Sequence, residues 1–179
     1  MATPALAAIP VLSDRDLATV TRLVYAKSGI SLHSGKRALV TARLQKLLKR
    51  SGFSTFKEYL RHLENDQSGS EMTAMLDAIA TNHTAFFREP QHFEFLAKVV
   101  LPPLRSHDEA APILGWSAAC SSGEEPYTIA MTAFEQLEGK PGRPLRLLAS
   151  DLSTKALARA TSAVYKAERV SGLPRHFIL

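Results

Sequence analysis

Apolar positions recur at intervals of three and four over the first 80 residues, which is the spacing of one face of an α-helix. Ser13 and Asp16 form a capping signature ahead of the segment LATVTRLVYAKSG, and Gly29 is a residue type that ends helices. A second helix is predicted over residues 34–50, with Gly52 closing it. Its inward side is expected to carry Leu39, Leu44, Leu47 and Leu48.

The same periodicity continues through two further segments. A third helix is predicted to begin near Ser54, and the polar residues 65–70 form a turn before a fourth helical pattern at residues 71–82. Residues 1–80 therefore predict a small helical bundle. The inward side chains expected from the third helix are Phe56, Tyr59, Leu60 and Leu63.

After residue 80 the pattern changes. Four phenylalanines fall within residues 86–95, and a helix follows that Pro102 and Pro103 are expected to end. Proline lacks the backbone N–H of a regular helix and its ring collides with the preceding turn.

Two short apolar runs, at residues 113–119 and 145–150, are each followed by a turn and a helical pattern. Gly139 is expected to end the first of these helices, and Ser153 or Thr154 to cap the second. Strand, turn and helix, repeated once, predict a parallel α/β sheet.

The composition is that of an ordinary globular protein. Hydrophobic residues make up 45% and charged residues 22% of the 179 positions, which argues against wholesale disorder. No apolar run approaches the roughly 20 residues that span a bilayer, and the first residues do not read as a signal peptide. The single cysteine, Cys120, cannot form an internal disulfide, so we expect a reducing cytoplasm and no cysteine-based zinc site.

Charge is distributed unevenly. Residues 1–66 carry 11 Lys and Arg against 5 Asp and Glu, whereas residues 67–179 carry 11 against 12. A basic first unit suits nucleic acid, an anionic membrane or an acidic protein surface. Nucleic-acid binding is the weaker interpretation, because no aromatic residues are interleaved with the basic ones. Four cations fall on one helical face, which could also be a merely solvated face: Lys36, Arg43, Lys46 and Arg50.

The turn 120–126, CSSGEEP, joins the first predicted strand to a helix. Small residues there allow a ligand to approach the backbone, while Glu124 and Glu125 disfavour a pyrophosphate and suit an ammonium group or hydroxyls. The two glutamates could instead only complement the helix dipole. Asp151, at the end of the second strand, could hold ribose hydroxyls or serve as a turn or capping residue.

The polar segment before the phenylalanines offers a further set of candidates. Asn82, Thr84 and Arg88 could bind a ligand, or could cap a helix and pair with neighbours. His83 has no partner at metal-ligand spacing, so no metal is expected. Cys120 is interpreted as a small turn residue rather than a nucleophile.

Three segments together resemble one family in order and spacing: TNHTAFFREPQHF, GWSAACSSGEEPYTIAM and ASDLSTKALARATSAVY. They are similar to chemotaxis receptor methyltransferases of the CheR type. The resemblance implies an α + α/β fold. A basic helical domain at 1–80 precedes the first part of a Rossmann-like methyltransferase fold at 81–179, with an incomplete parallel sheet. It also implies S-adenosylmethionine as methyl donor, glutamate carboxylates of receptors as acceptors, S-adenosylhomocysteine as product, and no metal.

The resemblance also implies roles for individual residues. Asn82, Thr84 and Arg88 fall on the family's cofactor-contacting motif, and Asp151 on its ribose-binding acid. Its cofactor-binding glutamate falls on Glu124 or Glu125, of which Glu124 is favoured. Arg88 could also steer the incoming carboxylate, because a guanidinium forks onto carboxylates. The four cations of the basic face would meet the acidic helices of a receptor.

The family's pattern continues beyond this chain, which holds only two of its predicted strands. A two-stranded parallel sheet with one face uncovered is hard to stabilise alone. We therefore expect a shortened chain, a proteolytic fragment, or a protein that completes its sheet by dimerising or swapping elements. The alternative function is that of a non-catalytic fragment which binds the receptor or the cofactor.

Overall fold

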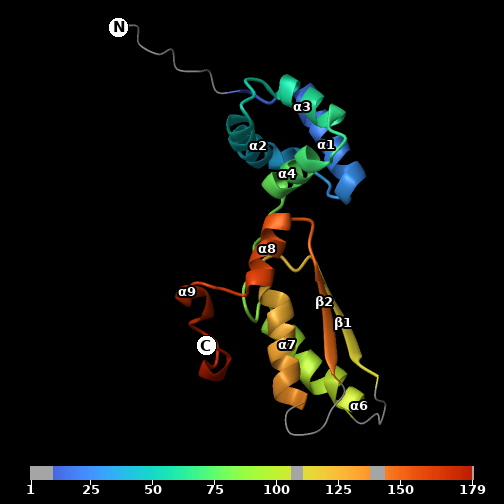
Figure 1. Ribbon diagram of the computed structural model, residues 1–179, viewed down its shortest axis with the longest axis vertical. Helices are drawn as coiled ribbons and strands as arrows, with labels where there is room; N and C mark the ends of the chain where they lie inside the picture. The colour runs from blue at the N-terminus through green and yellow to red at the C-terminus, as the bar shows by residue number, and fades with distance from the viewer. Residues whose placement is uncertain (1–9, 106–110, 138–143, 179) are drawn as a thin grey trace. The chain divides into compact units, whose positions relative to one another are not determined.

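The chain divides into two compact units in the computed structural model, which describes residues 10–105, 111–137 and 144–178 (Figure 1). We call residues 1–80 the N-terminal unit and residues 81–179 the C-terminal unit. No helix in the described part of the chain is long and apolar enough to cross a membrane.

The N-terminal unit contains four α-helices in its described residues. The predicted capping box is confirmed, because the Ser13 hydroxyl accepts a hydrogen bond from the Asp16 N–H and the Asp16 carboxylate accepts one from the Ser13 N–H. Thr55 and Glu58 form a second capping box. Both boxes satisfy backbone donors that a helix start would otherwise leave unpaired. The helices are α1 (Asp14–Ser28), α2 (Arg37–Ser51), α3 (Phe56–Asn65) and α4 (Ser70–Ile79), with a 3₁₀ turn at Ser34–Lys36 before α2.

The four helices bury one apolar core. All four inward residues predicted for α3 are buried, as are Leu44, Leu47 and Leu48 of α2. Leu39 was expected inward and that prediction is wrong, because its side chain is 44% exposed and Val40 is buried instead. A helix turns by about 100° per residue, so the inward face of α2 runs through Val40, Leu44 and Leu47 and leaves Leu39 beside it.

The predicted turn at 65–70 is organised by Asp66. Its carboxylate accepts hydrogen bonds from the Ser68 and Ser70 hydroxyls and from the Ser68 and Glu71 N–H groups. These bonds, led by the one from the Ser68 hydroxyl, lower the pKa of Asp66. Asp66 thereby satisfies the start of α4, whose own N-cap position is Gly69 in the left-handed region.

The C-terminal unit opens with a helical stretch that runs through the two prolines. The expected stop at Pro102 and Pro103 is wrong, because α6 continues to Arg105. A π-helical turn lies immediately before α6, and its wider backbone provides room for pyrrolidine rings that a regular α-helix would exclude. The stretch consists of α5 (Pro90–Phe95), the π turn η2 (Leu96–Val100) and α6 (Leu101–Arg105).

The predicted parallel sheet is confirmed. Strand β1 (Ile113–Ala118) pairs in parallel with β2 (Leu145–Ser150), and the register places Ile113 opposite Leu145 and Ala118 opposite Ser150. The crossover helix α7 (Glu124–Leu137) begins within the predicted turn, and its expected end at Gly139 lies outside the described residues. Ser153, one of the two predicted caps, accepts a hydrogen bond from the Ala156 N–H at the start of α8 (Thr154–Ser162). The chain continues through α9 (Ala167–Val170) and a 3₁₀ turn at Arg175–Phe177.

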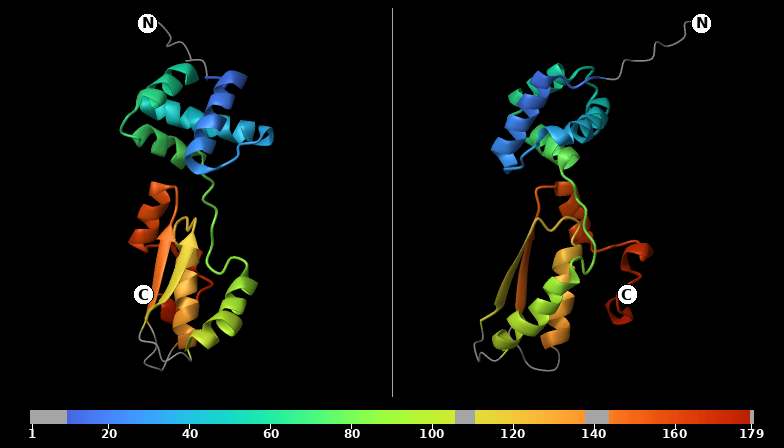
Figure 2. Two further views of the ribbon diagram at one scale, coloured as in Figure 1. Left: turned by 90° about the vertical axis from the view of Figure 1, so that its right-hand side faces the viewer. Right: turned by 180° about the vertical axis from the view of Figure 1, so that it is seen from behind.

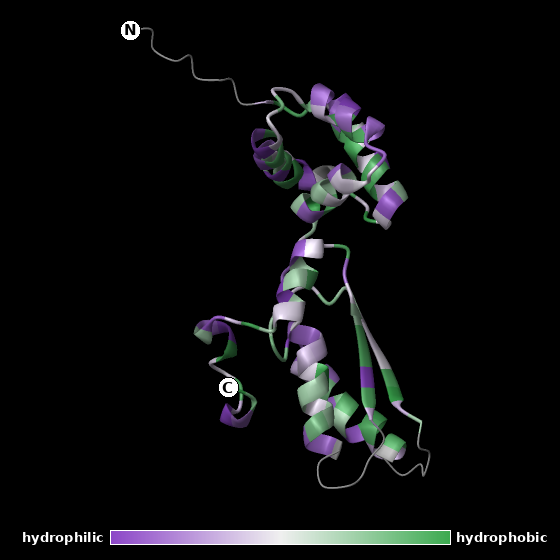
Figure 3. Cartoon of the chain, viewed as in Figure 1, coloured by the Kyte–Doolittle hydropathy of each residue, from purple (hydrophilic) through white to green (hydrophobic). Residues whose placement is uncertain are grey.

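Among the residues that the structure describes, helices cover one face of this sheet and leave the other without a helix (Figures 1 and 2). On the other face Leu114, Trp116 and Leu148 are 75%, 68% and 64% exposed. Figure 3 shows that both strands are mainly hydrophobic, with one hydrophilic segment in β2, where exposed Arg146 lies opposite Leu114. The uncovered face is therefore largely apolar and carries a cation. The prediction of an incomplete sheet with one uncovered face therefore holds for the described residues.

Candidate functional site

The loop after β1 has an unusual backbone conformation. Ala119, Ser121 and Gly123 all have positive φ angles, of 65°, 50° and 97°. A Cβ atom at Gly123 would lie 2.7 Å from the Tyr165 hydroxyl oxygen and 3.0 Å from the Ala160 Cα atom, so only glycine fits there. We call residues 119–123 the site loop.

Asp151 holds the site loop against the end of β2. Its Oδ2 accepts a hydrogen bond from the Ser121 N–H at 2.8 Å, and its Oδ1 accepts one from the Ser153 N–H at 2.8 Å. Asp151 therefore has the turn role that the sequence allowed, and the N-cap of α8 is Ser153. Each carboxylate oxygen keeps a second lone pair, so Asp151 can still accept a bond from a ligand hydroxyl.

Cys120 is enclosed within the same loop. Burial, and then the Asp151 charge, raise the pKa of its thiol, which keeps it protonated. A protonated, buried thiol is a poor nucleophile, in line with its interpretation as a small turn residue.

Glu124 is the buried acid of the site. Its residue is only 1% exposed at the start of α7, where Oε2 accepts a hydrogen bond from the Ser122 hydroxyl at 2.7 Å and Oε1 is paired with the Arg169 guanidinium. Burial by itself raises the pKa of Glu124, but the hydrogen bonds from Ser122 and Arg169 outweigh it, and the pKa lies below its ordinary value. Glu125 differs sharply, because it is exposed and accepts a bond from the Ser117 hydroxyl instead.

Arg169 also connects Glu124 to the polar segment ahead of α5. The guanidinium nitrogen that meets Glu124 donates a second hydrogen bond to the Thr84 carbonyl oxygen at 2.8 Å. The same segment contacts α7 again where the Phe87 N–H donates to the Thr128 hydroxyl at 3.2 Å. Two segments that the sequence singled out independently are thus brought together by side chains of the C-terminal unit.

The remaining residues predicted for this segment lie at its surface. Asn82 and Arg88 are exposed, and the Arg88 guanidinium donates to the His83 carbonyl oxygen at 3.0 Å. Arg88 therefore stabilises the turn in which it lies, and its exposed head can still meet a carboxylate.

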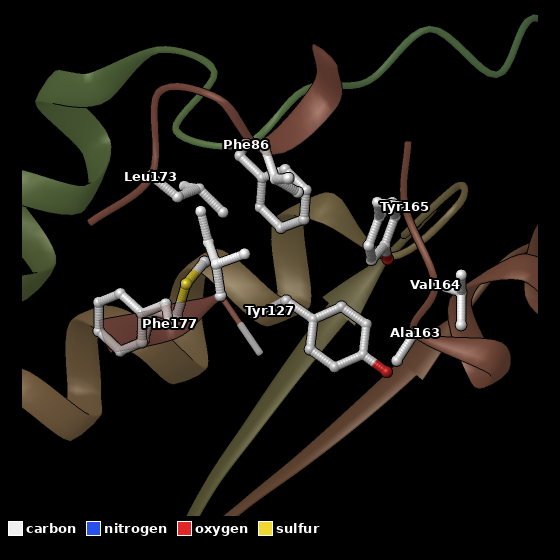
Figure 4. Close-up of a pocket in the computed structure, with 10 residues that line it drawn as sticks. Phe86, Tyr127, Ala163, Val164, Tyr165, Leu173 and Phe177 are labelled. Atoms are coloured by element: carbon white, nitrogen blue, oxygen red, sulfur yellow. The ribbon is translucent and has the colours of Figure 1, made fainter. Parts of the chain in front are cut away.

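An apolar cavity of about 500 Å³ lies in the C-terminal unit (Figure 4). The rings of Phe86, Tyr127, Tyr165 and Phe177 face it from three parts of the C-terminal unit. The Tyr165 hydroxyl donates to the Ser122 carbonyl oxygen at 2.6 Å, and its ring packs edge-on against Phe86 at 4.9 Å. Burial, and then the charge of Glu124, raise the pKa of Tyr165, so its proton stays in this bond.

One polar atom in the site loop is left over. The Ser121 hydroxyl is buried and has no hydrogen-bond partner among the residues that the structure describes. Such groups are costly unless something pairs with them. Together with the buried anion Glu124 and the accepting Asp151, it suits a ligand that carries an ammonium group and hydroxyls. In the described ranges no group of three or more His, Cys, Asp or Glu could hold a metal ion.

The four basic residues predicted for a partner lie in the N-terminal unit, and they are not equivalent. Lys46 and Arg50 are exposed along α2, and Lys36 is exposed at its N-cap position. Arg43 is partly buried, and its guanidinium donates to the carbonyl oxygens of Ile79 and Ala80 at the end of α4. Arg43 therefore has a structural role that its spacing with the other three did not indicate.

Arg169, Tyr165 and Ser121 are the site residues that sequence reasoning did not select. Arg169 lies 45 positions from Glu124, and no periodic pattern relates residues so far apart. The sequence offered no direct signal, because the need of Glu124 for a cation follows only once its burial is known.

Each of the two units matches a known family of protein domains. Residues 15–80 match the family described as "CheR methyltransferase, all-alpha domain", and residues 82–178 match "CheR methyltransferase, SAM binding domain". The chain is 40% identical over 169 residues to a chemotaxis protein methyltransferase of Borreliella burgdorferi, covering 92% of this chain and 60% of the relative. It is 39% identical over 162 residues to a chemotaxis protein methyltransferase of Escherichia coli, covering 90% of this chain and 54% of the relative.

A third relative, chemotaxis protein methyltransferase 2 of Pseudomonas aeruginosa, is 40% identical over 159 residues, covering 89% of this chain and 55% of the relative. The chain thus spans between 54% and 60% of the length of these three relatives. The resemblance carried by the three sequence segments is confirmed by matches over both units, and the chain belongs to the CheR methyltransferase family.

Proposed function

We propose that the protein transfers a methyl group from S-adenosylmethionine to glutamate side-chain carboxylates of chemotaxis receptors, giving methyl esters and S-adenosylhomocysteine. The activity, its substrate and its partner are all part of the proposal, because the chain spans little more than half the length of the relatives it matches. A reducing cytoplasmic setting belongs to the same proposal, and the single cysteine supports it.

The observation that carries the proposal is the buried, ionised Glu124 beside the site loop. A buried carboxylate with a lowered pKa is well suited to receive the ammonium group of the cofactor's amino-acid end. Asp151, on the other side of the loop, would accept from ribose hydroxyls, as acids at the ends of parallel strands commonly do. Asn82, Thr84 and Arg88 would complete the cofactor site from the segment that Arg169 ties to Glu124.

The proposed chemistry asks for positioning rather than for a dedicated base. S-adenosylmethionine, when bound, supplies a methyl group that is already activated by its positive sulfur. A glutamate carboxylate is already anionic at neutral pH, so the protein has to align the two groups and exclude water. Arg88, exposed at the edge of the site, would steer the acceptor carboxylate.

The basic face of α2 supports an acidic helical partner. Lys36, Lys46 and Arg50 are exposed and would meet the acidic methylation helices of a receptor. Arg43 would contribute to such a surface only as far as its bonds to Ile79 and Ala80 allow.

A matched pair of variants tests the cofactor site by calorimetry with S-adenosylhomocysteine. Glu124→Gln should weaken binding at least tenfold, because a buried charge partner is lost, whereas Glu125→Gln should change the affinity by less than about twofold. Equal effects of the two substitutions, or no binding by the unmodified chain, would contradict the proposed site.

Transfer itself is measured with methyl-labelled S-adenosylmethionine and receptor-containing membranes, counting base-labile methyl esters. Label on the receptor that is lost on conversion of its methylated glutamates to alanine would support the proposal. Cofactor binding without transfer would favour the alternative, a receptor- or cofactor-binding fragment without catalysis.

The uncovered sheet face supports the expectation that more polypeptide covers it, either further chain or a second copy. Leu114, Trp116 and Leu148 would otherwise remain in water. Sedimentation of the 179-residue chain tests the second-copy alternative. A concentration-dependent dimer that Trp116→Ser weakens would support pairing through this face, and a monomer with undiminished cofactor binding would contradict it.

A further inference from the structure

Arg169 contacts two residues of the proposed cofactor site without being one of its predicted members. It lies in the short helix α9, and one of its nitrogens donates both to the Glu124 carboxylate and to the Thr84 carbonyl oxygen. Its side chain is 46% exposed, whereas that of Glu124 is 1% exposed. The pair is therefore asymmetric: the acid is enclosed and the base reaches it from the surface.

A buried carboxylate must be compensated or it takes up a proton. In the described part of the chain Arg169 is the cation recorded against Glu124, and Ser122 is the hydroxyl that binds its other oxygen. With both oxygens engaged, the rotation of the carboxylate is restricted. Each oxygen accepts one side-chain hydrogen bond and has a second lone pair.

We propose that Arg169 is a positioning residue that holds Glu124 as an oriented anion, ready to receive a cationic group of the ligand, and that joins it to the Thr84 segment. The ligand named here, the ammonium end of S-adenosylmethionine or its product, rests on the proposed function. The orienting role itself stands on the contacts among Arg169, Glu124, Ser122 and Thr84.

Charged and titratable groups around Glu124 set the pH dependence. Tyr165 precedes α9 and stays protonated. Glu125, which follows Glu124 on α7, is exposed and accepts a hydrogen bond from the Ser117 hydroxyl. Asp151 faces the other side of the site loop, where two N–H groups bind it. Removal of Arg169 takes away a hydrogen bond and a charge that lower the pKa of Glu124, and leaves the Ser122 and backbone hydrogen bonds to oppose burial, so the pKa should rise.

The test measures the affinity of the chain for S-adenosylhomocysteine at pH 6 and pH 8 for Arg169→Met, Arg169→Lys and a control, Arg159→Met, which changes an exposed arginine of α8. Arg169→Met should weaken binding at least tenfold at pH 6 and by a smaller factor at pH 8, where Glu124 regains its charge. Arg169→Lys should recover part of the loss, and Arg159→Met should bind as the unmodified chain does. An equal loss of affinity at both pH values would overturn the proposal, because it would mean that Arg169 has only a structural role. Tighter binding by Arg169→Met would also overturn it, because it would mean that Arg169 competes with the ligand for Glu124.

A readout without ligand separates this inference from the proposed function. Carbon-13 NMR of the Glu124 carboxyl group should show this acid titrating at a higher pH in Arg169→Met than in the unmodified chain, where its pKa is lowered. If the unmodified chain binds no S-adenosylhomocysteine but this upward shift appears, the proposed function fails and the positioning role stands. An unchanged Glu124 titration in a folded Arg169→Met chain overturns the positioning role whatever the chain binds.

Discussion

In the N-terminal unit the buried side chains are large and apolar, whereas in the C-terminal unit many of the buried side chains are small or polar. Leu44, Leu48, Tyr59 and Met75 are each at most 1% exposed in the first unit. The buried residues of the second include Ser117, Ser121, Glu124, Thr128, Thr132 and Ser153, together with Cys120 and three alanines.

The difference shows that the two units are stabilised by different kinds of interaction. The N-terminal unit gains from removing apolar area from water, and its turns and capping boxes only fix the helix ends. The C-terminal unit leaves part of its apolar area exposed on the sheet and instead encloses a hydrogen-bonded network around the site loop. A network of that kind fixes geometry more than it stabilises, because each buried polar group must first be desolvated.

The largest effect is expected from a cavity in the N-terminal core. Leu44→Ala should lower the free energy of unfolding of the N-terminal unit by about 3 kcal/mol, since a fully buried leucine is removed. The matched change Leu148→Ala, on the uncovered sheet face, should alter stability by less than about 0.5 kcal/mol. Urea unfolding followed by circular dichroism gives the first value, and fluorescence of Trp116, the single tryptophan, reports on the C-terminal unit. Equal losses of unfolding free energy from both substitutions would contradict this difference between the two units.

A smaller but more specific effect is expected at the site loop. Gly123→Ala should destabilise the C-terminal unit by about 2 kcal/mol, because alanine is strained at a φ of 97° and its Cβ would collide with Tyr165 and Ala160. Gly172→Ala is the control, because a Cβ atom at Gly172 would meet no atom within 4 Å. Trp116 fluorescence in urea measures both. A stable Gly123→Ala chain would mean that the loop is less tightly held than its contacts indicate.

The next effect concerns the end of α4, where Arg43 provides a polar contact within the N-terminal unit. Arg43→Met should cost about 1.5 kcal/mol, because charged hydrogen bonds to the Ile79 and Ala80 carbonyl oxygens are lost. Lys49→Met, an exposed cation of the same helix, should be close to neutral. Thermal unfolding by circular dichroism distinguishes the two variants. Equal stability of both would mean that the hydrogen bonds of Arg43 do not stabilise the N-terminal unit.

The smallest effect concerns pH, and it should have the same sign in both units. The pKa values of Asp66 and Glu124 are lowered, so their contributions to stability are fully present above the unfolded carboxylate pKa of about 4 and are lost as the pH falls below it. Melting curves between pH 7 and pH 3 should therefore be flat down to about pH 5 and then fall. Asp66→Asn should reduce the fall in the N-terminal unit, while Glu64→Gln, an exposed partner of Arg22, should leave it unchanged. A unit that gains stability in acid would contradict the two directions.

Local signals in the sequence predicted most of the fold. The capping box at Ser13, the inward face of α3 and the parallel pairing of two strands follow from residues close together in the chain. The errors, at Leu39 and at Pro102, arose where a one-residue shift of phase or a π turn decided the result. Neither leaves a clear mark on the spacing of apolar residues.

The candidate site divides in the same way. Sequence alone placed the turn with Glu124 after one predicted strand and Asp151 after the other, and the carboxyl ends of parallel strands share one edge. Thr84 was selected in the polar segment ahead of the phenylalanines, and its cofactor role came from the family resemblance. Only the tertiary structure decided that Glu124 rather than Glu125 is enclosed and that Arg169, 45 residues away, is its partner. Local propensity depends on neighbours in the chain, whereas the choice of a charge partner depends on which surfaces the packed elements bring together, and that is fixed only once the whole unit has folded.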